Sequence, residues 1–137
     1  MKVILDTNIL ISALIRNSIT RKIIFTSYLD FYYPKQSIEE VYRHKNLILK
    51  KSGMTSKNFD ELFSSLLEVI HLVSEEIVEV GLDMAKKTGI EDSDDFVFLA
   101  CAFEIAGSIL WSDDKGFETQ NSVKVMKTEE IIKLLKM

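Results

Sequence analysis

The acidic residues of this 137-residue chain gather in clusters that follow apolar segments. Clustered carboxylates repel one another, and they stay ionised together only where a cation neutralises them; otherwise some take up protons. Oxygen ligands with few histidines suit Mg²⁺ or Mn²⁺ better than Zn²⁺. A divalent ion in such a site can activate water and stabilise a phosphoryl transition state, so the pattern favours phosphodiester hydrolysis. The clustered acids are Asp6, Glu39, Glu40, Asp92, Asp94, Asp95, Asp113 and Asp114.

Strands that alternate with helices could bring these clusters to one edge of a sheet. The alternation predicts an α/β fold in a single domain, residues 1–137, with a parallel sheet and helices on both faces. Ligands of such folds gather at the carboxyl ends of strands, where the strand order switches. Apolar segments predict strands at 2–6, 31–33, 70–73, 108–112 and 123–126. Helical spacing predicts helices that begin at Thr7 and cover 19–29, 35–50, 56–69, 74–88, 94–106 and 128–136.

Most of these acids also have a purely structural explanation, because acidic side chains favour helix N-termini. Ser37 and Glu40 match the S-x-x-E pattern of a capping box. Asp92 could cap the helix 94–106, and Asp113 could cap a short turn after its strand. Taken one at a time, these positions do not separate a capping role from a functional one.

Asp95 is harder to explain as a structural residue. It shares a helix face with Leu99 and Ala102 of the segment 94–106, which is apolar nearly all round and is therefore predicted to be buried. An uncompensated carboxylate at the rim of such a face is costly. The position favours a functional carboxylate.

Composition predicts a globular protein of ordinary type, with 47% hydrophobic and 28% charged residues. The single cysteine, Cys101, excludes an intramolecular disulfide and a cysteine-rich zinc site. Asp6 and Asn8 interrupt the apolar N-terminal segment, which carries no small-residue cleavage site. No segment approaches the roughly 18 apolar residues of a membrane span. We therefore expect a cytoplasmic protein without a membrane segment.

The charges are unevenly distributed along the chain. Residues 1–57 carry ten Lys and Arg against four Asp and Glu, whereas residues 58–137 carry seven against seventeen. This asymmetry indicates either a basic contact surface beside an acidic site or two solvated helix faces. Arg43 and Lys45, which follow Glu40, could contact an RNA backbone through its phosphates or form part of a solvated cationic face.

Four segments of the chain resemble the PIN-domain family of metal-dependent nucleases. They are VILDTNIL at 3–10, IEEVYRH at 38–44, DSDDFVFLACA at 92–102 and LWSDDKGF at 110–117. Their order and spacing match the family over essentially the whole chain. The resemblance implies a three-layer α/β/α sandwich with a central parallel sheet of four to five short strands, and an acidic site that binds Mg²⁺ or Mn²⁺.

The resemblance also implies roles for individual residues by position. Asp6, Asp95 and Asp114 are expected to ligate metal, with Glu40 as a fourth catalytic acid in direct or water-mediated contact. Asn8 is expected to orient Asp6 or a metal-bound water. Ser112 is expected either to support Asp114 through its hydroxyl or only to terminate its strand. Asp92, three residues before Asp95, is the favoured alternative among the acids that neighbour the selected ones.

The function implied by the resemblance is endoribonucleolytic cleavage of RNA. Small members of the family include toxins of toxin–antitoxin pairs of the VapC-like type, so an antitoxin partner and a homodimer are expectations as well. Alternatives stay open: an RNA-processing or DNA-directed nuclease without an antitoxin, a catalytically inactive nucleic-acid-binding PIN module, and a phosphatase-like metal hydrolase.

Overall fold

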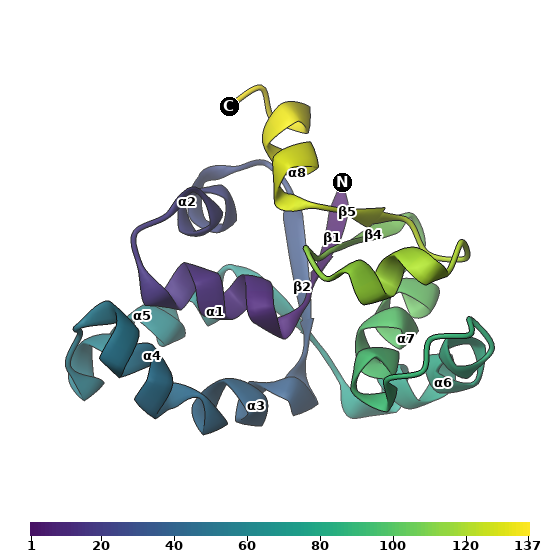
Figure 1. Ribbon diagram of the computed structural model, residues 1–137, viewed down its shortest axis with the longest axis horizontal. Helices are drawn as coiled ribbons and strands as arrows, with labels where there is room; N and C mark the ends of the chain where they lie inside the picture. The colour runs from purple at the N-terminus through teal and green to yellow at the C-terminus, as the bar shows by residue number, and fades with distance from the viewer.

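A computed structural model describes all 137 residues and shows a five-stranded sheet covered by helices (Figure 1). Every strand pair is parallel, and the strand order is β3-β2-β1-β4-β5. The predicted parallel sheet is therefore confirmed. The strands are β1 (Lys2–Leu5), β2 (Asp30–Pro34), β3 (Ile70–Val73), β4 (Ser108–Trp111) and β5 (Val125–Met126).

Helices cover both faces of the sheet, which gives the predicted three layers. Helices α1 to α5 lie on one side, and α6 and α7 lie on the other (Figure 1). The α-helices are α1 (Thr7–Ile15), α2 (Ile19–Thr26), α3 (Ile38–Arg43), α4 (Lys45–Ser52), α5 (Ser56–Glu68), α6 (Glu75–Lys86), α7 (Phe96–Glu104) and α8 (Thr128–Leu134). Three short 3₁₀ helices are η1 (Lys35–Ser37), η2 (Ser93–Asp95) and η3 (Lys115–Thr119). No helix has both the length and the apolar character needed to cross a membrane.

The strand order reverses between β1 and β4. The chain moves outward from β1 through β2 to β3, and then returns across the other face to β4 and β5. Leu5 pairs with Trp111, and the Asp6 amide donates a hydrogen bond of 3.4 Å to the Trp111 carbonyl. Asp6 and Ser112 therefore lie side by side at the point where open α/β sheets bind ligands.

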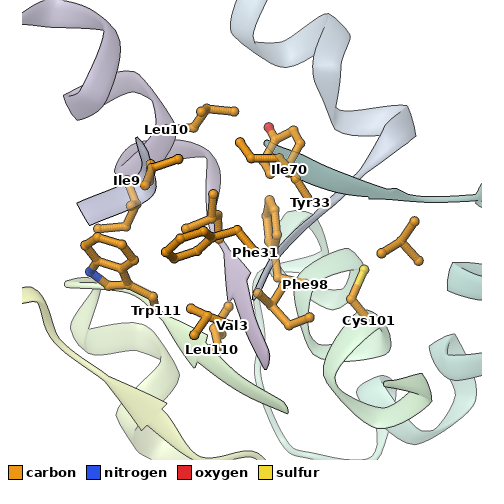
Figure 2. Close-up of a cluster of buried hydrophobic side chains, with 14 of the residues drawn as sticks. Val3, Ile9, Leu10, Phe31, Tyr33, Ile70, Phe98, Cys101, Leu110 and Trp111 are labelled. Carbon is orange, nitrogen blue, oxygen red and sulfur yellow. The ribbon is translucent and has the colours of Figure 1, made fainter. Parts of the chain in front are cut away.

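One continuous core of 33 buried hydrophobic residues supports this edge of the sheet. Val3, Ile4 and Leu5 of β1 are fully buried, as expected for a central parallel strand that is covered on both faces. Trp111 and Phe31 pack close together in this core, with ring centroids 6.2 Å apart (Figure 2). The core fixes the strand ends on which the acidic side chains stand.

The predicted helix 35–50 is wrong as a single element. The structure has the 3₁₀ helix η1 followed by two helices that meet at His44, whose backbone is not helical. The His44 imidazole Nδ1 lies 2.8 Å from the Glu40 carbonyl oxygen, and the His44 amide donates to the Val41 carbonyl instead. The side chain thus occupies the acceptor that a continuous helix would use, which ends α3.

The helix predicted at 94–106 is shorter and less buried than expected. Its first turn is the 3₁₀ helix η2, and α7 ends at Glu104. Phe98 to Cys101 are buried against the sheet and α6, but Phe96, Val97, Ala102 and Phe103 are only half-buried. Smaller boundary shifts shorten the strand predicted at 123–126 to Val125–Met126 and the helix predicted at 19–29 to Ile19–Thr26.

Candidate functional site

Four acids from distant parts of the sequence line one small cavity at the carboxyl ends of β1 and β4. Asp6 follows β1, Asp114 is the third residue after β4, Glu40 lies in α3, and Asp95 ends η2. The cavity has a volume of about 60 Å³, and Asn8 also lines it. Its other lining residues are Thr7, Asp94, Phe98 and Phe117. The structure thus brings together the four acids that sequence reasoning selected.

Asp6 is both the N-cap of α1 and the most buried acid of the site. Its Oδ1 accepts a hydrogen bond of 2.8 Å from the Ile9 amide, and its residue exposure is 5%. Burial raises the pKa of this carboxyl to about 6, a shift that the Ser112 hydroxyl and the Ile9 amide oppose and that the charges of Asp113 and Asp114 reinforce. A cation beside Asp6 would remove the cost of holding this charge in place.

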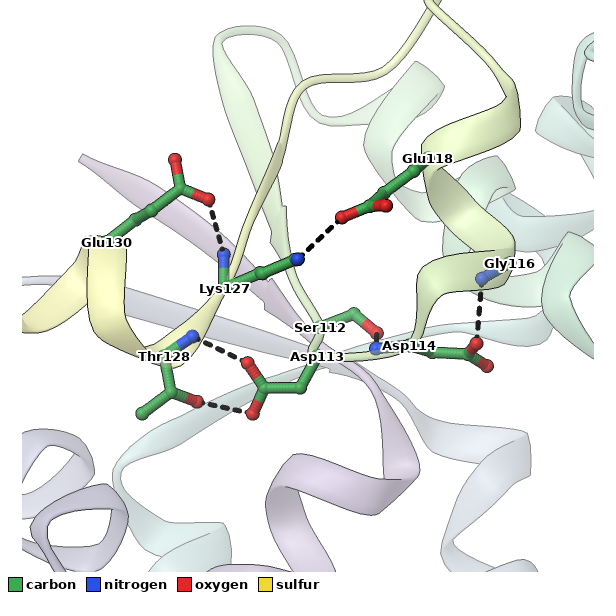
Figure 3. A network of polar contacts seen from close by, with 8 residues as sticks. All are labelled: Ser112, Asp113, Asp114, Gly116, Glu118, Lys127, Thr128 and Glu130. Atoms are coloured by element: carbon green, nitrogen blue, oxygen red, sulfur yellow. Dashed lines mark hydrogen bonds and ion pairs between the residues drawn. The ribbon is translucent and has the colours of Figure 1, made fainter.

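Asp114 is held by a short loop of its own chain segment. The Ser112 hydroxyl, fully buried, accepts a hydrogen bond of 3.1 Å from the Asp114 amide (Figure 3). The Asp114 Oδ1 accepts one of 2.8 Å from the Gly116 amide, which makes Asp114 the cap of η3. A Cβ at position 116 would lie 3.2 Å from that oxygen, so glycine allows the close approach. Oδ2 has no donor from the protein.

Asp95 stands at the junction of η2 and α7 with other acids around it. Burial, followed by the charges of Asp92, Asp114, Asp6 and Asp94, raises its pKa to about 6. Asp94 shares the acidic cavity, whereas Asp92 lines a neighbouring one together with Asp95. Asp92 Oδ1 also accepts a hydrogen bond of 3.0 Å from the Asp94 amide, so it caps the turn that presents the two acids.

Glu40 reaches the cavity without the capping box that its sequence suggests. The Ser37 side chain makes no capping hydrogen bond, so this structural explanation of Glu40 is wrong. Instead, the Tyr33 hydroxyl donates to the Ser37 carbonyl at 3.0 Å and lies 2.8 Å from Thr7 Oγ1. This buried chain of hydrogen bonds ties the start of α1 to the start of α3, and Glu40 and Asp6 line the same cavity.

Sequence reasoning missed Thr7 and Tyr33. Their roles depend on a contact between residues 26 apart along the chain, and neither residue type signals such a contact by itself. Thr7 directly follows the first acid, and Tyr33 lies near the end of a predicted strand. Only the strand order shows that these two positions face each other.

Several charged residues near the clusters lie elsewhere. Asp113 does not cap the turn that follows it; its two oxygens accept from the Thr128 amide and hydroxyl at 2.7 Å each (Figure 3). Glu39 lines a separate cavity. Lys45 forms an ion pair of 3.0 Å with Asp60, Arg43 is exposed, and neither cation lines the acidic cavity.

The donor set fits a hard divalent cation. Asp6, Asp95 and Asp114 offer only carboxylate oxygens, and the charges of Asp6 and Asp114 each raise the pKa of the Asp95 carboxyl. No three His, Cys, Asp or Glu side chains are already grouped as a ligand set, so an ion would draw these carboxylates closer together. The shared cavity and the mutual repulsion support these three residues as ligands.

Comparison with known proteins adds one finding. A family model described as PIN domain matches residues 4–136, nearly the whole chain. No curated protein matches the chain. The matched range includes every residue of the acidic cavity.

Asp6→Asn tests whether burial of the Asp6 charge costs stability. Because the folded pKa of about 6 exceeds the ordinary 3.8, ionisation of Asp6 destabilises the fold. The cost is absent below about pH 4 and complete above about pH 6, so the variant gains up to about 3 kcal/mol in unfolding free energy at pH 7.5 and far less at pH 4.5. Urea unfolding with EDTA at both pH values measures it.

Asp30→Asn is the control for that experiment, because Asp30 is an exposed acid at the amino end of β2. Its unfolding free energy stays within about 0.5 kcal/mol of wild type at both pH values. A loss of stability in Asp6→Asn at pH 7.5 contradicts the electrostatic account.

Tyr33→Phe tests the link between α1 and α3. The variant keeps the ring but leaves the buried Thr7 hydroxyl and Ser37 carbonyl without their partner, so the unfolding free energy falls by about 1–3 kcal/mol in urea denaturation. Tyr28→Phe is the matched control, because Tyr28 is 71% exposed. Equal stability of the two variants would rule out the proposed positioning role.

Proposed function

Since the chain belongs to the PIN-domain family, whose members are generally nucleases, we propose that it is a Mg²⁺- or Mn²⁺-dependent endoribonuclease. The observation that carries the proposal is the convergence of Asp6, Glu40, Asp95 and Asp114 on one cavity at the reversal of strand order. No single structural role explains why carboxylates from four separate segments line the same cavity. Binding of a shared cation and of a phosphate substrate would explain their convergence.

Asp6, Asp95 and Asp114 are the proposed metal ligands. A bound divalent ion supplies an activated water and stabilises the negative charge that develops on the phosphoryl oxygens. The protein contributes rigid placement: the Ile9 amide holds one oxygen of Asp6, and the Gly116 amide holds one oxygen of Asp114. Each of these carboxylates keeps a second oxygen for the ion.

Glu40 and Asn8 are the proposed partners of the attacking water. Glu40 is half-buried and Asn8 is exposed, and both line the cavity beside Asp6. A carboxylate in this place can accept a hydrogen bond and then a proton from water, and the Asn8 amide can orient either Asp6 or that water. Their position on α1 and α3 depends on the Thr7–Tyr33–Ser37 chain of hydrogen bonds.

A toxin role in a toxin–antitoxin pair, with a protein antitoxin as partner and a homodimer as the active form, belongs to the same proposal. The chain's membership of the PIN-domain family supports the role. An apolar stripe on α6 offers a surface for association: Ile77, Val80 and Met84 are 45%, 69% and 49% exposed at helical spacing. A cytoplasmic location agrees with a single buried cysteine, Cys101.

Asp114→Asn and Glu40→Gln test the proposed chemistry. Each variant lowers the Mn²⁺-dependent cleavage rate of a single-stranded RNA by at least about 100-fold, because loss of an outer metal partner alone costs 10- to 100-fold. Glu39→Gln is the matched control, since Glu39 neighbours Glu40 but lines a different cavity, and it cleaves at the wild-type rate. Gel assays with and without EDTA measure the rates.

Full activity in Asp114→Asn would refute the site assignment. Cleavage of DNA with no cleavage of RNA would replace the ribonuclease proposal by a DNA-directed one. Release of phosphate from small phosphoesters, with both polymers left intact, would favour a phosphatase-like hydrolase.

A further inference from the structure

A larger cavity, of about 510 Å³, is lined by residues from the end of α1, the start of α2, the end of α4 and the loop after β4. Arg16, Thr20, Lys51 and Asp113 line it from these four segments. None of these residues lines the acidic cavity. Its chemistry therefore needs an explanation of its own.

The cavity carries a surplus of positive charge. Arg16 and Lys51 are exposed, and neither forms an ion pair; the two ion pairs of the structure involve other residues. Asp113 is the only acid that lines the cavity, and both of its oxygens already accept hydrogen bonds of 2.7 Å from Thr128 (Figure 3). Two free cations beside one satisfied carboxylate favour an anionic ligand.

The N-terminus of α2 adds unused hydrogen-bond donors to the same cavity. Ser18 satisfies the third and fourth amides of the helix, because its Oγ accepts from Arg21 at 3.4 Å and its carbonyl from Lys22 at 3.1 Å. The Ile19 and Thr20 amides have no acceptor, as is usual for the first positions of a helix. These amides and the helix dipole favour an anion.

Thr20 supplies an observation independent of the helix end. Thr20 lines the cavity, and its residue exposure is 5%. Its hydroxyl makes no hydrogen bond within the protein, but it is open to solvent rather than sealed in the core. A hydroxyl that is open to solvent and has no partner in the protein is free to donate to a ligand in the cavity. An anion between Thr20 and Arg16 would be such a ligand.

The acidic site and this cavity are joined along one face of α1. Asn8 and Ser12 are exposed at i and i+4 of α1, and Arg16, directly after the helix, lines the basic cavity together with Ser12. The three residues thus mark a stripe from the acidic cavity to the basic one. With a rise of 1.5 Å per residue, the stripe is about 12 Å long. On the other side, Asp113 of the basic cavity directly precedes Asp114 of the acidic one. A ligand that spans both must be extended and must carry repeated anionic groups.

We propose that the basic cavity binds a backbone phosphate of the RNA strand beside the scissile bond. Arg16 and Lys51 neutralise the phosphate, while the Ile19 and Thr20 amides and the Thr20 hydroxyl donate hydrogen bonds to it. The contact fixes the position and direction of the strand across the acidic cavity without reading its bases. The inference rests on the proposed function, because it assigns a second contact with the same substrate.

Binding of a single-stranded RNA oligonucleotide tests this subsite apart from cleavage. Fluorescence anisotropy in EDTA, over a series of salt concentrations, compares wild type with Arg16→Gln/Lys51→Gln. The double variant binds at least about 10-fold more weakly at low salt, and the slope of log K against log salt falls in magnitude by about 0.7 for one lost phosphate contact. Thr20→Val weakens binding with the slope unchanged, because it removes a hydroxyl and no charge.

Lys22→Gln/Lys50→Gln is the matched control, since it removes the same charge from α2 and α4 outside the cavity. It binds within about 2-fold of wild type. Equal affinity and slope for the two double variants overturn the proposal, as does a wild-type protein that binds no single-stranded RNA. Wild-type binding that depends on Arg16 and Lys51, with no Mn²⁺-dependent cleavage, supports the phosphate subsite and refutes the nuclease proposal alone.

Discussion

Burial of carboxylates at the carboxyl ends of β1 and β4, reinforced by their mutual repulsion, is the constraint on which the rest of the site depends. Asp6 is 95% buried, which raises the pKa of its carboxyl, and the charges of Asp113 and Asp114 raise it further. The fold tolerates this because specific amides hold one oxygen of each acid, from Ile9 for Asp6 and from Gly116 for Asp114. Both acids line one cavity, where a divalent cation would neutralise their charges. Binding of the cation would then remove the cost of holding these charges in the metal-free protein.

Helix α1 connects this acidic centre with the rest of the proposed substrate path. Asp6 caps its first turn, Asn8 faces the acidic cavity, and Arg16 at its end faces the basic one. The uneven charge of the sequence thus has a spatial counterpart: the basic first part of the chain supplies both cations of the second cavity, and later segments supply Asp95 and Asp114. Under the proposed function, one helix sets the spacing between the phosphate that is cleaved and the phosphate that is held.

Sequence periodicity and strand-end placement predicted the parallel sheet and the segments on which the acids stand, because a buried strand and the polar residue that ends it are local signals. The resemblance to PIN domains then selected one acid per cluster.

Contacts between segments that are distant in the sequence could not be predicted from the sequence alone. Ser37 matches a capping box and makes none, since its backbone is helical at the end of η1 and not extended as in an ordinary N-cap. Asp113 binds Thr128, fifteen residues away. The unpaired cations of the basic cavity meet only after α1, α2 and α4 have packed together.

The most direct test of the account is a crystal structure of the protein soaked in Mn²⁺, with the ion located by its anomalous scattering. The account predicts a manganese ion in the acidic cavity, bound by oxygens of Asp6, Asp95 and Asp114, with Glu40 in direct or water-mediated contact. An ion held by other residues, or an empty acidic cavity at millimolar Mn²⁺, would contradict it.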